Sequence, residues 1–323
     1  MAVYTHLPAE ALAALIAQYD VGRLVSAKGI AEGVSNSNWL LETTGPGGRG
    51  ARYILTMYER RIDLADLPYF LDLLDHLSSA GAPVPRTIHD RLGKSFRLVD
   101  GKAVALIEFL PGVSVGRPTP AQARAVGAAL ARMHLAAQGF GRHRGNTLDP
   151  AANVATLARC GEAALSRIDP ALPVWVGKGQ GLLRQWPAEL PQSVIHSDLF
   201  PDNVLMLDDH VTGMIDFYFA CTDAMAYDLA VTHAAWSFEP GGDSFRPEIG
   251  TALVQGYLSV RPLKEEELAA LPLLAQGACL RFVASRAEDW IDTPPDAHVM
   301  RKDPMDFVRR WDFYAEHAAS VFA

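Results

Sequence analysis

Hydrophobic and polar positions divide the chain into an N-terminal part rich in predicted strands and a longer part rich in predicted helices. Short apolar runs bounded by glycine, proline and other turn residues indicate strands before residue 110. Apolar residues at helical spacing dominate after residue 118. The expected strands are 24–31, 39–43, 52–58, 95–99 and 103–109, and the expected helices are 8–19, 66–79, 119–137, 151–168, 175–190, 247–259, 265–290 and 303–322.

The segment EGVSNSN, residues 32–38, joins two of the expected strands and predicts a polar turn. Gly33 would let the backbone approach a ligand closely. Ser35, Asn36 and Asn38 offer hydrogen-bonding groups that could bind phosphate oxygens. The same composition is typical of an ordinary surface turn, so this segment alone leaves both interpretations open.

The strongest functional pattern is VIHSDLFPDNVLMLDDHVTGMIDF, residues 194–217. It predicts strand, loop, strand, turn and strand, with polar residues where the strands end. Asp198 and Asn203 stand five residues apart in the loop, and Asp216 follows the hairpin. Acidic residues can also be solvated turn residues, which is our interpretation of the two aspartates in the turn itself.

This order of carboxylate, amide and carboxylate is typical of phosphoryl transfer from a nucleotide. One carboxylate must accept the proton of the attacking hydroxyl, while an amide oxygen and a second carboxylate can hold Mg2+. Matching the loop to the kinase pattern H-R-D-x-x-x-x-N assigns the base to Asp198 and the metal to Asn203 and Asp216. Ser197 stands where protein kinases carry arginine, which argues against control by a phosphorylated activation loop.

Composition narrows the classes of partner. The chain has 323 residues, a formal charge of −8 and a pI near 5.7. The length suits two lobes, and the negative charge argues against nucleic acid or an anionic membrane as partners. No signal peptide or membrane-spanning apolar run is apparent in the sequence. Cys160, Cys221 and Cys279 are few and far apart, which fits reduced thiols and predicts a cytoplasmic protein.

The loop H-x-D-x-x-x-x-N followed by I-D-F resembles that of the aminoglycoside-phosphotransferase-like kinases, which include choline kinase-like enzymes. The resemblance implies an α+β, two-lobed, protein-kinase-like fold. A small antiparallel-sheet lobe over residues 1–108 would cover the nucleotide, and a mostly helical lobe over 109–323 would carry catalysis and the substrate. The resemblance also implies ATP and Mg2+ as cofactors, with His196 and Asp228 as structural supports of the active-site loop.

One position departs from this family. Its third strand normally carries lysine or arginine against the nucleotide phosphates, but Thr56 stands there in YILTMYE. Thr56 could face the nucleotide or solvent, since either suits a strand residue. In IEFLPG the family places the hinge that contacts adenine. The resemblance thus implies nucleotide contacts at Gly33, Ser35, Asn36, Asn38, Thr56, Glu108 and Leu110.

A narrower resemblance, over most of the chain, is to the homoserine kinases of this family. It rests on GVSNSNWLLET, YILTMYE, IEFLPG, HSDLFPDNVL and IDFYFACTDAMAYDLA. It implies ATP-dependent phosphorylation of the L-homoserine side-chain hydroxyl to O-phospho-L-homoserine, a step toward threonine. The carboxylate of such an acceptor calls for arginine or N–H donors, and its ammonium calls for a carboxylate. Candidate acceptor ligands are Tyr218, Asp223, Trp236, Arg281 and Arg286.

Two alternatives stay open at this point. The acceptor could be choline, methylthioribose or an aminoglycoside, because Tyr218, Trp236 and Trp290 could form an aromatic cage for a quaternary ammonium. A nucleotide-binding pseudokinase scaffold would explain Thr56, although it would not need the intact loop residues. Each kinase hypothesis predicts a small-molecule partner, and the sequence fits a monomer or a homodimer equally well.

Overall fold

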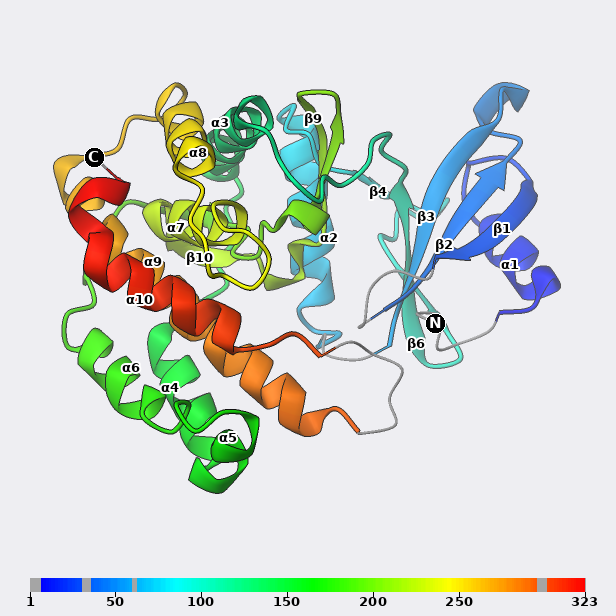
Figure 1. Ribbon diagram of the computed structural model, residues 1–323. Helices are drawn as coiled ribbons and strands as arrows, with labels where there is room; N and C mark the ends of the chain where they lie inside the picture. Colours follow the sequence, from blue (N-terminus) through cyan, green and yellow to red (C-terminus); the bar gives the residue numbers. More distant parts are fainter. Residues whose placement is uncertain (1–6, 31–35, 60–62, 295–300, 323) are drawn as a thin grey trace. The chain divides into compact units, whose positions relative to one another are not determined.

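The chain folds into two compact units, Met1–Pro111 and Gly112–Ala323. The expected lobe boundary lies at residue 108, and the assignment of a separate function to each lobe stays a prediction. Figure 1 follows the chain through both units in a computed structural model. The structure describes residues 7–30, 36–59, 63–294 and 301–322.

The described part of the N-terminal unit is built on an antiparallel sheet of six strands (Figure 1). The strand order is β1–β2–β3–β6–β4, and β5 pairs with β6. Asp100 and Gly101 turn the chain between β5 and β6 with positive φ angles of 51° and 80°, the geometry that an Asp-Gly hairpin favours. The elements are α1 (Ala9–Ile16), β1 (Leu24–Ile30), β2 (Asn36–Thr43), a short 3-10 turn (Pro46–Gly48), β3 (Ala51–Tyr58), α2 (Leu67–Ser79), β4 (Thr87–Ile88), β5 (Arg97–Val99) and β6 (Lys102–Glu108).

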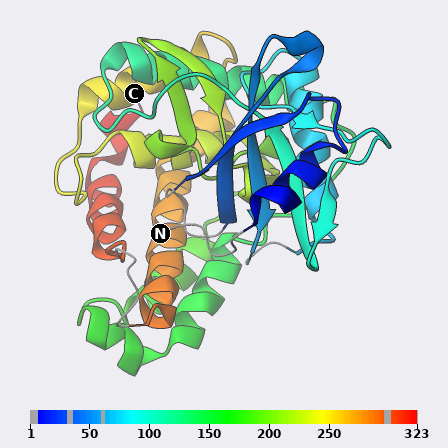
Figure 2. The same ribbon diagram turned by 90° about the vertical axis from the view of Figure 1, so that its right-hand side faces the viewer.

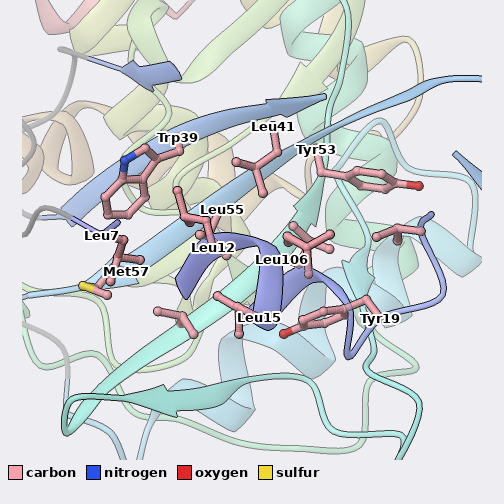
Figure 3. Packing of buried hydrophobic residues seen from close by; sticks show 13 residues of the cluster. Leu7, Leu12, Leu15, Tyr19, Trp39, Leu41, Tyr53, Leu55, Met57 and Leu106 are labelled. Atoms are coloured by element: carbon pink, nitrogen blue, oxygen red, sulfur yellow. The ribbon is translucent and has the colours of Figure 1, made fainter. Parts of the chain in front are cut away.

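The apolar side of α1 packs on one face of this sheet. Figure 3 shows Leu12 and Leu15 of α1 beside Leu55 of β3 and Leu106 of β6. Each such buried side chain contributes roughly 1.5–3 kcal/mol by leaving water. The cluster comprises Leu7, Leu12, Leu15, Ile16, Tyr19, Val21, Trp39, Leu41, Tyr53, Leu55, Met57, Val104 and Leu106.

The opposite face of the sheet carries polar side chains. Directly paired residues share a face in an antiparallel ladder, and Asn38 pairs with Thr56. Because side chains alternate along a strand, both lie opposite the face of Leu55. β2 begins at Asn36, so the expected turn over 32–38 is wrong at its C-terminal end. Pairing with β3 satisfies the backbone there and outweighs the weak strand preference of asparagine.

The C-terminal unit is mostly helical, with two short ribbons, β7–β10 and β8–β9, among its described strands. Thr119 caps α3 through a full capping box with Gln122, as the sequence predicts. The elements are α3 (Pro120–Ala137), α4 (Pro150–Cys160), α5 (Glu162–Ile168), α6 (Trp175–Leu183), β7 (Gln192–Ile195), β8 (Val204–Leu207), β9 (His210–Met214), β10 (Cys221–Ala224), α7 (Met225–Trp236), α8 (Pro247–Leu258), α9 (Glu265–Asp292) and α10 (Met305–Val321).

Helix α9 is the central helix of this unit. In Figures 1 and 2 it runs beside α10, while α4, α5 and α6 gather at one end of it. Among the described helices it alone is long and apolar enough to cross a membrane, with a mean hydropathy of 1.5 over 18 residues. Its apolar composition has another explanation, because 61% of that window is buried inside the protein. A core helix needs apolar residues on most of its faces.

Most expected elements are confirmed, and most of the differences lie at the ends of helices and strands. The helix expected over 151–168 is two helices, because Gly161 adopts a positive φ of 78° between α4 and α5. The helix expected over 175–190 ends at Leu183, four residues before Pro187, and β10 was not foreseen. Each of the three cysteines is a free thiol, as expected.

Candidate active site

The loop after β7 is held by a buried carboxylate of α7. Asp228 is fully buried, and its two oxygens accept hydrogen bonds from the backbone N–H groups of His196 and Ser197, each at 2.7 Å. The same carboxylate meets Nε2 of His134 at 3.0 Å. A hydrogen bond that involves a charged group is about twice as strong as a neutral one. These contacts support the structural role expected of Asp228.

The start of the loop has a constrained backbone. Ser197 adopts a left-handed φ of 61°, which is uncommon for a residue other than glycine. The His196 ring beside it is completely buried, with Nε2 2.9 Å from the Ile215 carbonyl oxygen and Nδ1 accepting the Asp198 N–H at 3.2 Å. Burial lowers the pKa of His196, so the ring is neutral and donates from Nε2. His196 therefore joins the loop to the end of β9.

Asp198 and Asn203 meet within the loop. Nδ2 of Asn203 donates to the Asp198 carbonyl oxygen at 2.8 Å and approaches its carboxylate oxygen Oδ2 at 3.4 Å. The Asn203 carbonyl oxygen accepts the N–H of Ile215 at 3.0 Å. Asp216 is the next residue and is left-handed, with φ 67° and ψ 55°. The structure thus brings together the three residues that the sequence predicts for chemistry.

The environment of the two carboxylates is unusual for aspartate. Burial raises the pKa of Asp198 to about 7, opposed by the positive charges of Arg281 and Lys302. Burial also raises the pKa of Asp216 to about 6, with Asp202 adding to the shift and Lys302 opposing it. The Asp216 residue nevertheless keeps exposed surface, so a ligand can reach it although protein atoms crowd its carboxylate. A carboxyl with a pKa near 7 can exchange protons readily at neutral pH.

The loop residues fit a hard divalent cation shared with phosphate oxygens. Nδ2 of Asn203 is occupied by Asp198, and Oδ1 accepts no hydrogen bond from the described residues. Asp216 offers a carboxylate beside it. Nowhere in the described ranges do three or more His, Cys, Asp or Glu side chains gather to hold a metal. One amide and one carboxylate are nevertheless the kind of set that Mg2+ uses when a nucleotide and water supply the other ligands.

Arg281 lies beneath the loop and not at an open acceptor position. Its side chain comes from α9, and the residue is only 2% exposed. Nη1 donates to the carbonyl oxygen of Ser197 and, at 2.9 Å, to its hydroxyl. Nη2 lies 3.7 Å from Oδ1 of Asp198. The guanidinium is thus engaged with the loop, and the role of Arg281 as a ligand of a substrate carboxylate stays a prediction.

Two other acceptor candidates are also engaged within the protein. Trp236 is buried, and its indole N–H donates to the Leu199 carbonyl oxygen at 2.8 Å. It therefore supports the loop from below and lacks the exposed ring that an aromatic cage requires. Asp223 pairs in register with Ser193, near the start of β7. The catalytic loop follows the other end of that strand. Its carboxylate accepts Nδ2 of Asn146 at 2.7 Å.

The two remaining acceptor candidates are Tyr218 and Arg286. Tyr218 is half-buried and follows Asp216 by two positions. Nη1 of Arg286 donates to the Asp303 carbonyl oxygen at 2.8 Å and to the Asp306 carboxylate at 2.9 Å. Burial lowers the pKa of Arg286, and nearby carboxylates oppose that shift, Asp198 among them.

Candidate nucleotide residues lie in the N-terminal unit. Gly33 and Ser35 fall outside the described residues. Thr56 is buried, and its hydroxyl donates to Oδ1 of Asn38 at 2.8 Å across β2 and β3. Asn36 is buried at the next pair along the same face, and its Oδ1 has no hydrogen-bond partner among the residues that the structure describes. Asn36, Asn38 and Thr56 therefore form a polar strip on one face of the sheet.

The predicted hinge residues stand where β6 ends. Glu108 receives the backbone N–H of Arg86 at 3.3 Å and pairs in register with Tyr53. Leu110 is half-buried, two residues further on. Both lie beside the boundary of the two units at Pro111.

Lys302 is a site residue that the sequence did not predict. It precedes α10, is exposed, and its ammonium lies over the Phe200 ring at 5.8 Å. Its charge acts on both Asp198 and Asp216. Nothing local in the sequence marks it, because only the packing of the C-terminal segment against the loop brings it there.

Comparison with known proteins identifies the family. The profile described as the phosphotransferase enzyme family matches residues 26–263. Proteins named homoserine kinase are similar over nearly their full length. The one from Acidiphilium cryptum is 47% identical and covers 99% of each chain. Those from Granulibacter bethesdensis and Methylobacterium nodulans are 47% and 46% identical, with 97% of this chain covered and 97% and 96% of their own.

Solved structures are similar in fold at much lower identity. An amicoumacin kinase in complex with AMP-PNP and Ca2+ has a TM-score of 0.69 at 14% identity, with 98% of this chain and 95% of that chain covered. A microcompartment-associated aminopropanol kinase has a TM-score of 0.64 at 19% identity, with 98% and 99% covered. Both agree with the antiparallel-sheet and helical units described above. The chain belongs to the phosphotransferase enzyme family and, within it, to the homoserine kinases.

Proposed function

We propose that this protein transfers the γ-phosphoryl group of ATP to the side-chain hydroxyl of L-homoserine and releases O-phospho-L-homoserine and ADP. The observation that carries the proposal is the 47% identity to a protein named homoserine kinase over 99% of both chains. The loop of Asp198, Asn203 and Asp216 supports the reaction class independently of that name. A reaction of this kind supplies a phosphorylated intermediate of amino-acid synthesis, in this case toward threonine, and fits a cytoplasmic enzyme.

Asp198 is the proposed base. Its carboxylate accepts the proton of the homoserine hydroxyl as that oxygen bonds to the γ-phosphorus and the bond to the ADP oxygen breaks. The raised pKa, about 7, suits this exchange because the group is a stronger base than an ordinary aspartate. Arg281, 3.7 Å away, keeps part of the population ionised at neutral pH.

Asn203 and Asp216 are the proposed ligands of Mg2+, which neutralises phosphate charge when it is bound. Asn203 offers its amide oxygen, since its NH2 group is bonded to Asp198. The polar strip of Asn36, Asn38 and Thr56 is the proposed nucleotide face of the N-terminal unit, together with Gly33, Ser35, Glu108 and Leu110.

The acceptor is a zwitterion, so its two charges need partners. Lys302 and Arg286 are the proposed cations for its carboxylate, because both lie within electrostatic reach of Asp198. Tyr218 is the proposed hydroxyl donor. A neutral or permanently cationic acceptor, such as choline, would gain nothing from these cations.

The test is ADP release by the purified protein with ATP and Mg2+ against L-homoserine, choline, methylthioribose, kanamycin and no acceptor. We expect release with homoserine alone and a product with the mass of O-phosphohomoserine. Asp198→Ala should abolish turnover while nucleotide binding is largely kept, and Asp216→Ala should also weaken Mg-ATP binding. Asp209→Asn, in the exposed turn before β9, is the matched control and should match wild type.

Each other outcome has a definite meaning. Turnover with another acceptor would keep the mechanism and reject homoserine as the substrate. Nucleotide binding without turnover on any member of the panel would favour an acceptor outside the panel or a nucleotide-binding scaffold. Full activity of Asp198→Ala would reject the base.

A further inference from the structure

The loop that carries the proposed base is clamped from two sides. Asp228 of α7 holds the N–H groups of His196 and Ser197, both at 2.7 Å. Arg281 of α9 holds the carbonyl and hydroxyl oxygens of the same Ser197. Ser197, which is left-handed with φ 61°, therefore has its backbone N–H held by α7 and its carbonyl and hydroxyl oxygens held by α9.

The Arg281 guanidinium is itself held in a single orientation. Its centre lies 5.0 Å from the Phe282 ring and 5.4 Å from the Phe219 ring. Aromatic faces attract a guanidinium and restrict where its plane can lie. With Nη1 on Ser197, the second nitrogen Nη2 is directed to Oδ1 of Asp198 at 3.7 Å.

The Asp198 carboxylate is thus oriented through both oxygens. Oδ1 faces Arg281 at 3.7 Å, and Oδ2 faces Nδ2 of Asn203 at 3.4 Å. Neither contact is short, so the carboxylate keeps lone pairs for an incoming hydroxyl while its rotation is limited. Small misplacements of a base can lower a reaction rate a hundredfold.

Protein kinases place an arginine in the loop itself, next to the base, whereas here that position is Ser197. A small residue there leaves room beneath the loop, and the guanidinium enters from α9, which lies 84 positions later in the chain. We propose that Arg281 is a positioning residue of phosphoryl transfer, which acts by fixing Ser197 and orienting Asp198. The proposal rests on the proposed role of Asp198 as the base.

The test compares Arg281→Gln and Arg281→Lys with wild type in steady-state assays with ATP and homoserine. Arg281→Gln should lower kcat by about a hundredfold per nucleotide-binding molecule and change both KM values by less than about threefold. Arg281→Lys should recover about tenfold, since it restores the charge without the planar fork. Arg159→Gln breaks an exposed ion pair between α4 and α9 and is the matched control.

A cycle with the base tests how Arg281 acts. In the Asp198→Asn background, Arg281→Gln should lower kcat by less than about a further threefold. Both changes disable the same pair of cooperating residues. If Arg281→Gln destabilises the fold, Ser197→Ala gives the second route. It removes the hydroxyl acceptor at 2.9 Å and should lower kcat by about threefold to tenfold at unchanged KM.

Three results would overturn the proposal. These are a homoserine KM raised tenfold at unchanged kcat, an unchanged kcat per nucleotide-binding molecule, and a full hundredfold loss in the Asp198→Asn background. The acceptor-free ATPase of the same variants reports on Arg281 whatever the acceptor is. A wild-type protein that is active as an ATPase but not on homoserine would reject the proposed substrate. The ATPase rate of Arg281→Gln relative to wild type would still decide for or against Arg281.

Discussion

At the scale of single residues, the surroundings of Asp198 suit proton transfer but lower the stability of the folded protein. Burial of the Asp198 carboxylate disfavours its charge, although Arg281 and Lys302 partly compensate. An aspartate whose pKa rises to about 7 is protonated in the folded state at a pH where the unfolded chain would ionise it. Folding stability is therefore lost as the pH rises from the unfolded pKa of 3.8 through the folded pKa.

This cost predicts that Asp198→Asn stabilises the protein when no metal is bound. The free energy of unfolding should increase by about 1–3 kcal/mol at pH 8, because asparagine fits the same space without a charge. This change in the free energy of unfolding is smaller than the pKa shift alone would give, because the Asp198 side chain is 19% exposed and solvent screens its charge. The gain should grow between pH 4 and pH 7 and stay constant above pH 7.

Urea denaturation in EDTA across this pH range measures that gain. Asp209→Asn makes the same chemical change in an exposed turn and should shift the free energy by less than about 0.5 kcal/mol. A stability difference between Asp198→Asn and wild type that falls as the pH rises would contradict the assigned pKa direction.

At the scale of elements, close packing of helices sets the frame for the loop. Helix α3 carries Gly127, and an added Cβ there would overlap the backbone of Leu253 in α8. The contact is reciprocal, because a Cβ on Gly256 of α8 would overlap the backbone of Arg124 in α3. Two glycines thus allow these helix backbones to approach more closely than any side chain permits. His134 of α3 is hydrogen-bonded to Tyr257 of α8 and to Asp228 of α7, which holds the loop.

We expect Gly127→Ala to destabilise the protein by about 2–4 kcal/mol, because the helices must move apart and the packing between them opens. Gly177→Ala in α6 is the matched control, since an added Cβ there meets nothing within 4 Å. It should stabilise by about 0.5–1 kcal/mol through helix propensity. Thermal and urea unfolding of both variants measure the difference, and equal effects would show that α3 and α8 are not held at this contact.

At the scale of the whole molecule, the chain is divided into two units of different construction. The N-terminal unit is a sheet with a helix on one face and the polar strip of Asn36, Asn38 and Thr56 on the other. The C-terminal unit holds every residue that we assign to proton transfer and metal binding. The long apolar helix α9 belongs to the core of that unit and supplies Arg281 to the loop.

Ligand binding should therefore stabilise the protein through both units. At 100 times its Kd, a nucleotide with Mg2+ stabilises the folded state by about 2.7 kcal/mol, which corresponds to a rise in Tm of roughly 4–8 °C. AMP-PNP with Mg2+ should produce this rise in wild type and in Asp209→Asn. Asp216→Asn should lose the part that depends on the metal, so that adding EDTA changes its Tm little. An EDTA response equal to that of wild type would remove Asp216 from the metal site.

The reaction class and most of the elements follow from local patterns in the sequence. The order of Asp198, Asn203 and Asp216 is local, and a loop of fixed length between short strands leaves few ways to place the three side chains. Helix α3 was predictable for the same reason, since its capping box and apolar spacing lie within one segment. The turn predicted over 32–38 extends too far, because strand pairing, a non-local interaction, begins at Asn36.

Which distant side chains meet the loop depends on how the chain folds and cannot be read from local patterns. Arg281, Trp236 and Lys302 looked alike as polar or aromatic positions on helices and a connecting segment. Folding places Arg281 under Ser197, Trp236 against the Leu199 carbonyl oxygen and Lys302 over Phe200. Their roles depend on burial and on partners tens of residues away, and helical spacing reports the face of a helix without reporting what packs on that face.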